Sequence, residues 1–146
     1  MRTTGRLPRR LAAGLAALVM GVTAALAIAA PAQATTTSAP CTTYEMCYWY
    51  ASGYGGAQTG VYDWAVYDLS NPAVYFYGGG SGSGTRLWNN AGSGANYDYD
   101  YCVAVYYSQG YGSPYLYLDS YSYGYWWSYT LDPVNNNNRS QHFWGC

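Results

Sequence analysis

The side chains with catalytic potential are few and widely spaced in this sequence. It has one histidine, His142, one glutamate, Glu45, and no lysine. Asp98 and Asp100 offer one carboxylate pair for acid–base chemistry, although acidic residues that keep the chain soluble are the simpler interpretation. No serine or cysteine has an evident general base. We therefore predict that the protein is not an enzyme.

The cysteines offer a different chemistry. Cys41, Cys47, Cys102 and Cys146 make an even number in a small chain, which indicates two disulfides with three possible connectivities. Cys41 and Cys47 are close enough to close a short loop, and Cys102 would then hold the C-terminal Cys146. A zinc site is the alternative, but Cys-x5-Cys is poor zinc spacing and His142 has no second ligand nearby in the sequence.

The first 34 residues have the pattern of a secretory signal peptide. An arginine-rich start precedes the apolar run Leu11–Ala30, and Ala32-Gln33-Ala34 is a small-residue cleavage signal. A membrane anchor is the alternative, since the run is about long enough to span, but the cleavage signal favours secretion. We expect a signal peptide at 1–34, a flexible tail at 35–40, one domain at 41–146, and an extracellular protein without membrane attachment after cleavage.

The charges of the chain after cleavage exclude two classes of partner. Only Arg86 and Arg139 are basic, against seven acidic residues, which gives a net charge of −5. A basic surface for nucleic acid is absent, and attraction to an anionic membrane is equally unfavourable. All 20 Tyr and 6 Trp lie in this part of the chain. Because aliphatic residues are scarce, we expect tyrosine and tryptophan to supply much of the buried area.

Short runs of β-branched and aromatic residues between Gly and Ser clusters predict an all-β domain. Candidate strands are Met46–Tyr50, Val61–Tyr67, Ala73–Tyr77, Tyr97–Tyr107, Tyr115–Leu118 and Tyr123–Tyr129. Period-two alternation through NYDYDYCVAVYY places Tyr97, Tyr99, Tyr101, Val103 and Val105 on one face. The segment GGGSGSG, residues 78–84, is expected to be a flexible loop.

An internal repeat organises these strands. WYASGYGG, from Trp49, and YYSQGYGS, from Tyr106, share the spacing of their aromatic residues, and each is followed later by Asn-Asn-x-x-Ser, which ends at Ser93 and at Ser140. The repeat predicts two copies of one supersecondary unit, at about 46–96 and 97–146. In such a unit the serine would bond to a folded hairpin, and the asparagines would tolerate left-handed turns.

This layout resembles the Greek-key motif of the βγ-crystallins, two of which form one sandwich domain. The start of the domain, APCTTYEMCYWYASGYGG, is also similar to secreted peptidase inhibitors of the Streptomyces metalloproteinase inhibitor type. The resemblance implies an all-β, disulfide-braced, βγ-crystallin-like sandwich. It also implies a possible calcium site, although no cofactor is required. Oxygen ligands of the kind that Ca²⁺ prefers would come from Asn89, Asn90, Ser93, Asn136, Asn137 and Ser140.

The resemblance implies a function as inhibitor of an extracellular peptidase, in which a rigid scaffold presents a loop to the protease cleft. Two segments are candidates for that loop: Asp68–Pro72, and the residues inside the small disulfide loop, Thr42, Thr43, Tyr44, Glu45 and Met46. The alternative is a binding module for cell walls or polysaccharides, or a killer-toxin-like domain. For that function the adjacent Trp126 and Trp127 are the candidates, because neighbours in a strand face opposite sides and one is then expected to be exposed.

Overall fold

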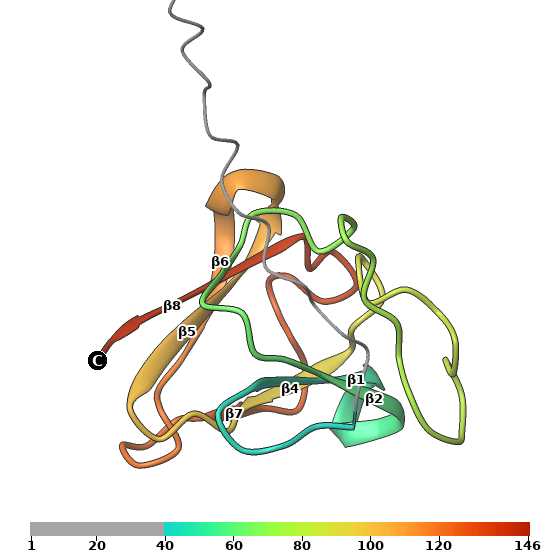
Figure 1. Cartoon of the computed structure of the whole chain (residues 1–146), viewed down its shortest axis with the longest axis horizontal. Coiled ribbons are helices and arrows are strands. Elements are labelled where there is room, and N and C mark those ends of the chain that lie inside the picture. The colour runs from blue at the N-terminus through green and yellow to red at the C-terminus, as the bar shows by residue number, and fades with distance from the viewer. Residues whose placement is uncertain (1–39) are drawn as a thin grey trace, which may run out of the picture. The chain divides into compact units, whose positions relative to one another are not determined.

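The computed structural model describes residues 40–146, which form an all-β domain (Figure 1). The signal peptide predicted at 1–34 lies outside the described residues, as does the tail up to residue 39. The first half contains β1 (Met46–Ala51), η1 (Ser52–Tyr54), β2 (Gly55–Val61), β3 (Ala65–Val66) and β4 (Ser93–Asn96). The second half repeats this order with β5 (Tyr101–Ser108), η2 (Gln109–Tyr111), β6 (Gly112–Leu118), β7 (Trp127–Ser128) and β8 (Ser140–Gly145). Between residues 40 and 146, no helix is long and apolar enough to cross a membrane.

The strands form two antiparallel sheets, and each half of the chain lends one strand to the other half. The first sheet has the order β2-β1-β4-β7 and the second the order β3-β8-β5-β6. Figure 1 shows β7, from the second half, beside β4 of the first. Because β3 pairs with β8 in the same way, the two halves are related by the same exchange of a strand. The prediction of two Greek-key motifs in one sandwich is confirmed.

Aliphatic side chains, rather than tyrosines, fill most of the core. Tyr48 is the one tyrosine of residues 40–146 that belongs to the buried core, whereas fourteen tyrosines are between 37 and 75% exposed. The prediction that tyrosine and tryptophan would supply much of the buried area is wrong for the core, to which residues 40–146 contribute Tyr48 alone of these two residue types. The phenol oxygen needs water or a partner, and the core is small enough to be filled by Met46, Val61, Leu69, Val74, Phe76, Leu87, Val103, Val105, Leu118, Leu131, Val134 and Phe143.

Some predicted strands agree with the observed strands, and others are wrong because a side chain caps a turn within the predicted segment. β1 and β6 match their predicted segments. The segment expected at 97–107 begins to pair only at Tyr101, because Asp98 Oδ1 accepts hydrogen bonds from the backbone N–H groups of Asp100 (2.8 Å) and Tyr101 (3.0 Å) and makes a turn. The segment Tyr123–Tyr129 contributes only the two residues of β7. Ala73–Tyr77 forms isolated bridges, and β2 and β8 were largely missed.

Both disulfides pair as proximity in the sequence suggested. Cys41 bonds to Cys47 with Cα atoms 5.6 Å apart, and Cys102 bonds to Cys146 with Cα atoms 5.2 Å apart. The first closes a loop ahead of β1, and the second fixes the end of β8 to the start of β5. Crosslinks of this kind stabilise small domains mainly by restricting the unfolded chain.

Candidate binding site

The repeated serines hold the two folded hairpins, in the same geometry in each half. Ser93 Oγ donates to Ala51 O (2.7 Å) and accepts from Tyr54 N (2.9 Å). Ser140 Oγ donates to Ser108 O (2.7 Å) and accepts from Tyr111 N (3.1 Å). Both serines are fully buried. Each hydroxyl therefore satisfies one N–H and one C=O group that the tight corner between two strands leaves without a ladder partner.

The two asparagine pairs lie against each other beneath these hairpins. Asn89 and Asn136 both adopt a left-handed backbone, with φ of 62° and 54°, which asparagine tolerates better than most residues. Asn89 N donates to Asn138 O and Asn136 N donates to Ala91 O, each at 3.0 Å. The side chains of the second asparagines close local turns, because Asn90 Nδ2 donates to Trp88 O and Asn137 Nδ2 to Asn135 O.

Three of these six residues already use their side-chain oxygens within the fold. Both serine hydroxyls hold hairpins, and Asn89 Oδ1 accepts a hydrogen bond of 3.1 Å from Arg139 Nε. The Arg139 guanidinium also lies 5.2 Å from the centre of the Trp88 ring. A guanidinium beside a candidate ligand opposes a divalent cation by charge repulsion, and a calcium ion needs six to eight oxygen ligands. The six candidate calcium ligands therefore fit a structural role better than a calcium site.

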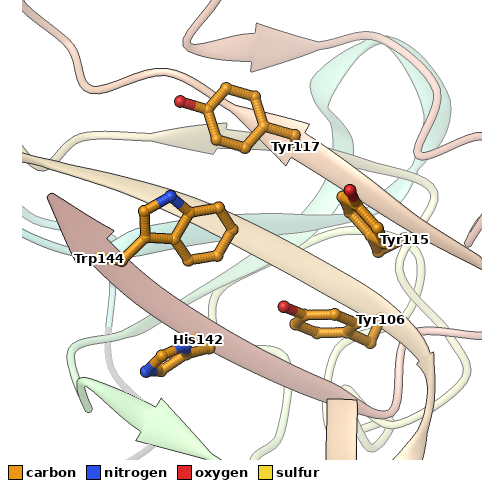
Figure 2. Close-up of a pocket in the computed structure, with 5 residues that line it drawn as sticks. All are labelled: Tyr106, Tyr115, Tyr117, His142 and Trp144. Carbon is orange, nitrogen blue, oxygen red and sulfur yellow. The ribbon is translucent and has the colours of Figure 1, made fainter. Parts of the chain in front are cut away.

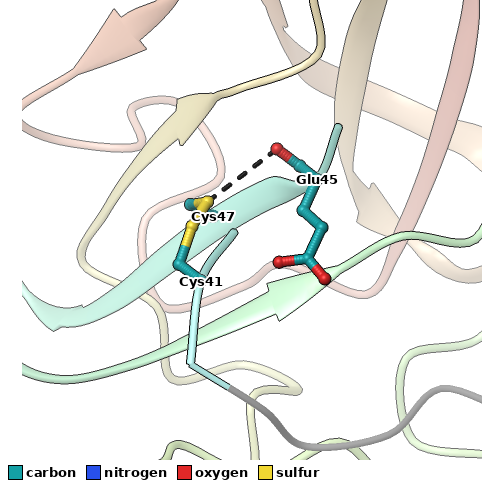
Figure 3. A group of neighbouring side chains, drawn as sticks. All are labelled: Cys41, Glu45 and Cys47. Carbon is teal, nitrogen blue, oxygen red and sulfur yellow. Dashed lines mark hydrogen bonds between the residues drawn. A yellow bond between two sulfur atoms is a disulfide. The ribbon is translucent and has the colours of Figure 1, made fainter. Parts of the chain in front are cut away.

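The small disulfide loop exposes only part of the segment expected to meet a peptidase. Thr42, Thr43 and Tyr44 are exposed. Figure 3 shows Glu45 beside the Cys41–Cys47 bridge, and its carboxylate turns back to accept a hydrogen bond of 2.7 Å from Thr42 N. Met46 is fully buried in the core. Met46 as a contact residue is therefore wrong, because it begins β1 with its side chain on the inner face.

Asp68–Pro72 is a structural turn that supports the second hairpin. Asp68 Oδ1 accepts from Ser70 N (2.8 Å) and Ser70 Oγ (2.6 Å), and Asp68 Oδ2 accepts from Gln109 Nε2 (2.9 Å). Leu69 is fully buried. Of the five residues, only Asn71 is exposed, so this segment presents little surface to a protease.

Trp126 and Trp127 are both half-buried, so the expectation of one exposed tryptophan is wrong. Trp126 packs against Tyr121, with ring centres 4.5 Å apart, and Trp127 packs against Tyr129, with ring centres 4.7 Å apart. The two rings do make separate contacts, as the alternation of a strand requires. Tyr121 and Tyr129 cover the tryptophan surface that was expected to be exposed.

A different group of aromatic side chains forms an open concavity on the second sheet. It has a volume of about 530 Å³ and is lined by Tyr106, Tyr115, Tyr117, His142 and Trp144 (Figure 2). We call it the aromatic hollow. Figure 2 shows its side chains rising from three neighbouring strands, β5, β6 and β8. The volume lies within the range of small-molecule sites, and no charged lysine, arginine, aspartate or glutamate lines it.

The strand register explains why there is a hollow at this place. Ala104, in the central strand β5, pairs with Tyr117 of β6 on one side and with His142 of β8 on the other. Residues directly opposite each other in a sheet point to the same face. The small side chain of Ala104 therefore lies between two large rings on the outer face. Ala104 itself is fully buried, so the rings on either side cover it.

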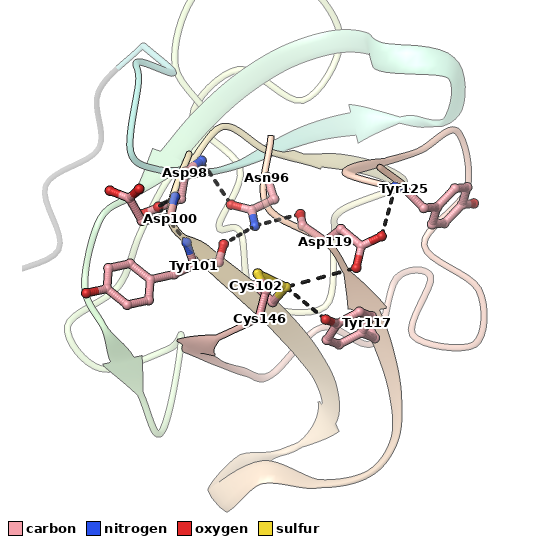
Figure 4. The surroundings of a disulfide bond; sticks show 9 residues. All are labelled: Asn96, Asp98, Asp100, Tyr101, Cys102, Tyr117, Asp119, Tyr125 and Cys146. Atoms are coloured by element: carbon pink, nitrogen blue, oxygen red, sulfur yellow. Dashed lines mark hydrogen bonds between the residues drawn. A yellow bond between two sulfur atoms is a disulfide. The ribbon is translucent and has the colours of Figure 1, made fainter. Parts of the chain in front are cut away.

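Burial of the hollow's tyrosines affects their ionisation. Burial raises the pKa of Tyr106, with a further contribution from Tyr115 nearby. Burial also raises the pKa of Tyr117, to which the Asp119 carboxylate adds. Figure 4 shows the Tyr117 hydroxyl beside the Cys102–Cys146 bridge, 2.8 Å from Cys102 Sγ. These phenols are therefore neutral hydrogen-bonding groups at physiological pH.

The equivalent face of the first sheet has a different lining, with a concavity of about 330 Å³ beside Trp49 and Gln58. The register makes Gln58 the counterpart of Tyr115, Gly60 that of Tyr117, and Ala95 that of His142. A side chain at Gly60 would collide with the Glu45 carboxylate, which the Cys41–Cys47 loop places over the sheet. Trp49 and Tyr97 correspond to Tyr106 and Trp144, so the halves differ in the other three positions, where only the second half has rings. Sequence reasoning missed the site because its residues come from three separate strands.

The first carboxylate of the Asp98–Asp100 pair takes part in the fold. Asp98 is 8% exposed and caps the turn before β5 through its Oδ1 atom. In Figure 4 it lies in a chain of hydrogen bonds, because Asp98 N donates to Asn96 Oδ1 (3.0 Å), and Asn96 Nδ2 donates to Tyr101 O (2.7 Å). Asp98 Oδ1 therefore stabilises the turn, and a catalytic role for this oxygen would require it to give up these hydrogen bonds.

Comparisons with known proteins agree on the fold. No family model matches the chain, and no curated protein matches it significantly. A solved structure concerned with the evolution of the eye-lens βγ-crystallin domain fold is 14% identical, with a TM-score of 0.53, over 75% of this chain and 93% of that chain. The N-terminal domain of protein S is also 14% identical, with a TM-score of 0.49, over 69% of this chain and 96% of that one.

The first of these likenesses, together with the exchange of β3 and β7 between the sheets, defines the class of fold. The chain is an all-β, disulfide-braced, βγ-crystallin-like domain of two Greek-key motifs. A fold does not determine function, so the role of this protein has to be argued from the site.

Proposed function

We propose that the protein is a secreted binding module that holds a neutral polysaccharide, such as a cell-wall glycan, in the aromatic hollow. The observation that carries the proposal is the asymmetry between the halves: the Glu45 carboxylate lies over Gly60 in the first sheet, whereas Tyr117 stands in the same register position of the second sheet and lines the hollow. A fold requirement shared by both halves does not explain why rings occupy the positions of Tyr115, Tyr117 and His142 in the second half only.

The chemistry of the lining favours a sugar chain. The faces of pyranose rings carry C–H groups that pack on aromatic rings, while the phenol and imidazole groups of the lining offer hydrogen bonds to sugar hydroxyls. Tyr115 is 52% exposed and Tyr117 is 39% exposed, so their rings are accessible without rearrangement. Because no carboxylate, lysine or arginine lines the hollow, a neutral glycan fits better than an acidic one.

Affinity electrophoresis in gels containing soluble β-glucan, glycol chitin or xylan tests this function. We expect at least one polysaccharide to retard the protein, and we expect Tyr115→Ala and Trp144→Ala to reduce the retardation at least fivefold. Tyr115→Phe, which keeps the ring, should retain most of it. Tyr123→Ala is the matched control, because Tyr123 is 75% exposed and lies outside the hollow. Equal mobility of the wild type with every polysaccharide would contradict the proposal.

A second candidate function is inhibition of an extracellular peptidase. The Cys41–Cys47 bridge and the bond from Glu45 to Thr42 N support it, because they hold Thr42, Thr43 and Tyr44 in a short exposed loop. A preorganised loop lowers the entropy cost of binding in a cleft. Titration of secreted metallo-, serine and cysteine peptidases is the test. We expect near-stoichiometric inhibition of at least one, which Thr43→Arg weakens and Tyr123→Ala does not; flat titrations in all three classes would refute it.

A further inference from the structure

A second concavity lies between three segments that are far apart in the sequence. It has a volume of about 190 Å³ and is lined by Tyr44, Tyr62, Trp64, Asp98, Asp100, Tyr101 and Phe143. We call it the Trp64 pocket. Tyr44 comes from the disulfide loop, Trp64 from the connection between β2 and β3, and the aspartates from the turn before β5. Its volume is below the range for drug-sized ligands, so it suits a single functional group.

The walls of this pocket are aromatic faces and edges. Trp64 and Tyr101 have ring centres 4.4 Å apart and meet edge to face at 82°. Trp64 is 49% exposed and Tyr62 is 71% exposed, so both rings retain free surface. A cation over the face of a Trp or Tyr ring is attracted by the negative charge density of the π system. Walls of this kind accept an organic cation whose carbon atoms also pack against the rings.

The base of the pocket contains a buried carboxylate with an unused oxygen. Asp98 is 8% exposed, and its Oδ1 atom accepts from Asp100 N and Tyr101 N. The Oδ2 atom has no hydrogen-bond donor within residues 40–146. Because Asp98 lines the pocket and this oxygen is not held by a protein donor, its negative charge attracts a cation that enters the pocket. The exposed Asp100 adds a second negative charge at the same place.

No cationic side chain of residues 40–146 lines this pocket. Its lining includes no arginine or histidine, and Arg139 is committed to Trp88 and Asn89 elsewhere. Two carboxylates within an aromatic enclosure attract positive charge more strongly than they would in open water, because the surrounding rings lower the local dielectric constant. The negative charge of the remainder of the domain acts in the same direction.

From these features we propose that the Trp64 pocket binds an alkylammonium group, with the rings of Trp64 and Tyr101 around its carbon atoms and the carboxylates of Asp98 and Asp100 facing its charge. The group is carried either by a lysine side chain of a partner or by a free amine. The proposal is independent of the aromatic hollow, because the two sites share no lining residue.

An NMR titration of the ¹⁵N-labelled protein with choline chloride tests the site directly. The control ligand is 3,3-dimethyl-1-butanol, which has the shape of choline without its charge. We expect choline to shift the Trp64 indole and the Asp100 and Tyr101 amide signals, with weaker affinity at 0.5 M NaCl, and we expect the neutral alcohol to bind at least tenfold more weakly. Equal binding of both ligands, or no shift with choline, would overturn the proposal.

Two variants with the same change in net charge test whether choline binds in the Trp64 pocket. Asp100→Asn should weaken choline binding at least threefold, whereas Asp132→Asn, an exposed aspartate outside the pocket, makes the same change in net charge and should not. An equal loss in both would mean non-specific attraction and would overturn the assignment. Asp100 contributes its backbone, not its side chain, to the turn, so the variant is expected to fold. A parallel titration with the peptide Ac-Gly-Lys-Gly-NH₂ distinguishes the two sources of the group. Tighter binding of the peptide than of choline indicates a lysine side chain of a partner, and tighter binding of choline indicates a small free amine.

Discussion

At the scale of single residues, two buried hydroxyls account for much of the architecture. Ser93 and Ser140 each join a hairpin corner to the strand that pairs beside it. Each serves one donor and one acceptor that are shielded from water, so the loss of either hydroxyl leaves two backbone groups unsatisfied. An unsatisfied buried polar group costs more than an average hydrogen bond contributes.

Ser93→Ala and Ser140→Ala should each lower the free energy of unfolding by about 1–3 kcal/mol. Urea denaturation followed by tryptophan fluorescence measures the change. Ser122→Ala is the control, because Ser122 is exposed in a loop, and its effect should stay within about 0.5 kcal/mol. If alanine at position 93 were as harmless as alanine at 122, the hairpin bonds would not have the importance that their geometry suggests.

Calcium can be tested at the same residues. Because both serine hydroxyls hold hairpins and Arg139 bonds to Asn89, we expect the melting temperature to be the same, within about a degree, in 5 mM CaCl₂ and in 5 mM EDTA. Ligands that bind only the native state raise its stability, so a bound ion would be visible. A rise in calcium that disappears in Ser93→Ala would instead establish the site that the resemblance implies.

At the scale of elements, the two hairpin corners are alike in backbone and different in surroundings. Gly53 and Gly110 adopt φ of 67° and 68°, and each precedes a tyrosine that is also left-handed. A methyl group added at Gly53 would meet no atom, whereas one at Gly110 would press on the ring of Tyr67. The same substitution therefore separates backbone strain from steric conflict.

Gly53→Ala should cost about 1–2 kcal/mol, since a left-handed conformation is unfavourable for any residue with a Cβ atom. Gly110→Ala should cost measurably more, because the Tyr67 ring must also move. Thermal and urea unfolding give both values. In a Tyr67→Ala background the two glycine substitutions should become equal. A difference that persists there would show that the Tyr67 contact is not its cause.

The elements also show what the sequence can and cannot predict. The corner spacing, the repeated serines and the cysteine pairs involve local patterns or an internal repeat, and they led to the correct fold class. β2 was largely missed because GGAQTGV is rich in glycine, and its glycines make room for Ser81 and Glu45 packed above them. The alternation of tyrosine with polar residues through 97–100 predicted a strand, but the chain turns there because Asp98 caps the turn.

The candidate site was harder to predict than the fold. The aromatic hollow joins residues from β5, β6 and β8, and only the register of the three strands brings Tyr117 and His142 to either side of Ala104. The excess of tyrosine was correctly noticed but was assigned to the core. A signal was nevertheless present, since the second repeat has tyrosines where the first has Gln58 and Gly60.

At the scale of the whole molecule, the many tyrosines make stability sensitive to alkaline pH. Burial raises the pKa of Tyr48 well above its usual value. Burial and neighbouring tyrosines raise the pKa of Tyr54 to about 12, and burial also raises those of Tyr97, Tyr106, Tyr111 and Tyr117. Above pH 10 the unfolded chain loses these protons while the folded chain keeps them. The folded state then binds more protons, and its stability falls as the pH rises.

Urea unfolding between pH 7 and 11.5 should therefore show constant tyrosine-dependent stability up to about pH 9 and a progressive loss above pH 10, the unfolded value for tyrosine. Tyr48→Phe should lower stability at pH 7 by about 1 kcal/mol, because it removes the bond of 2.7 Å to Gln141 Oε1, yet it should make the alkaline loss less steep. Tyr123→Phe should leave the profile unchanged, because that side chain is 75% exposed in the folded protein. A profile as steep in Tyr48→Phe as in the wild type would mean that the buried phenol does not contribute to alkaline unfolding.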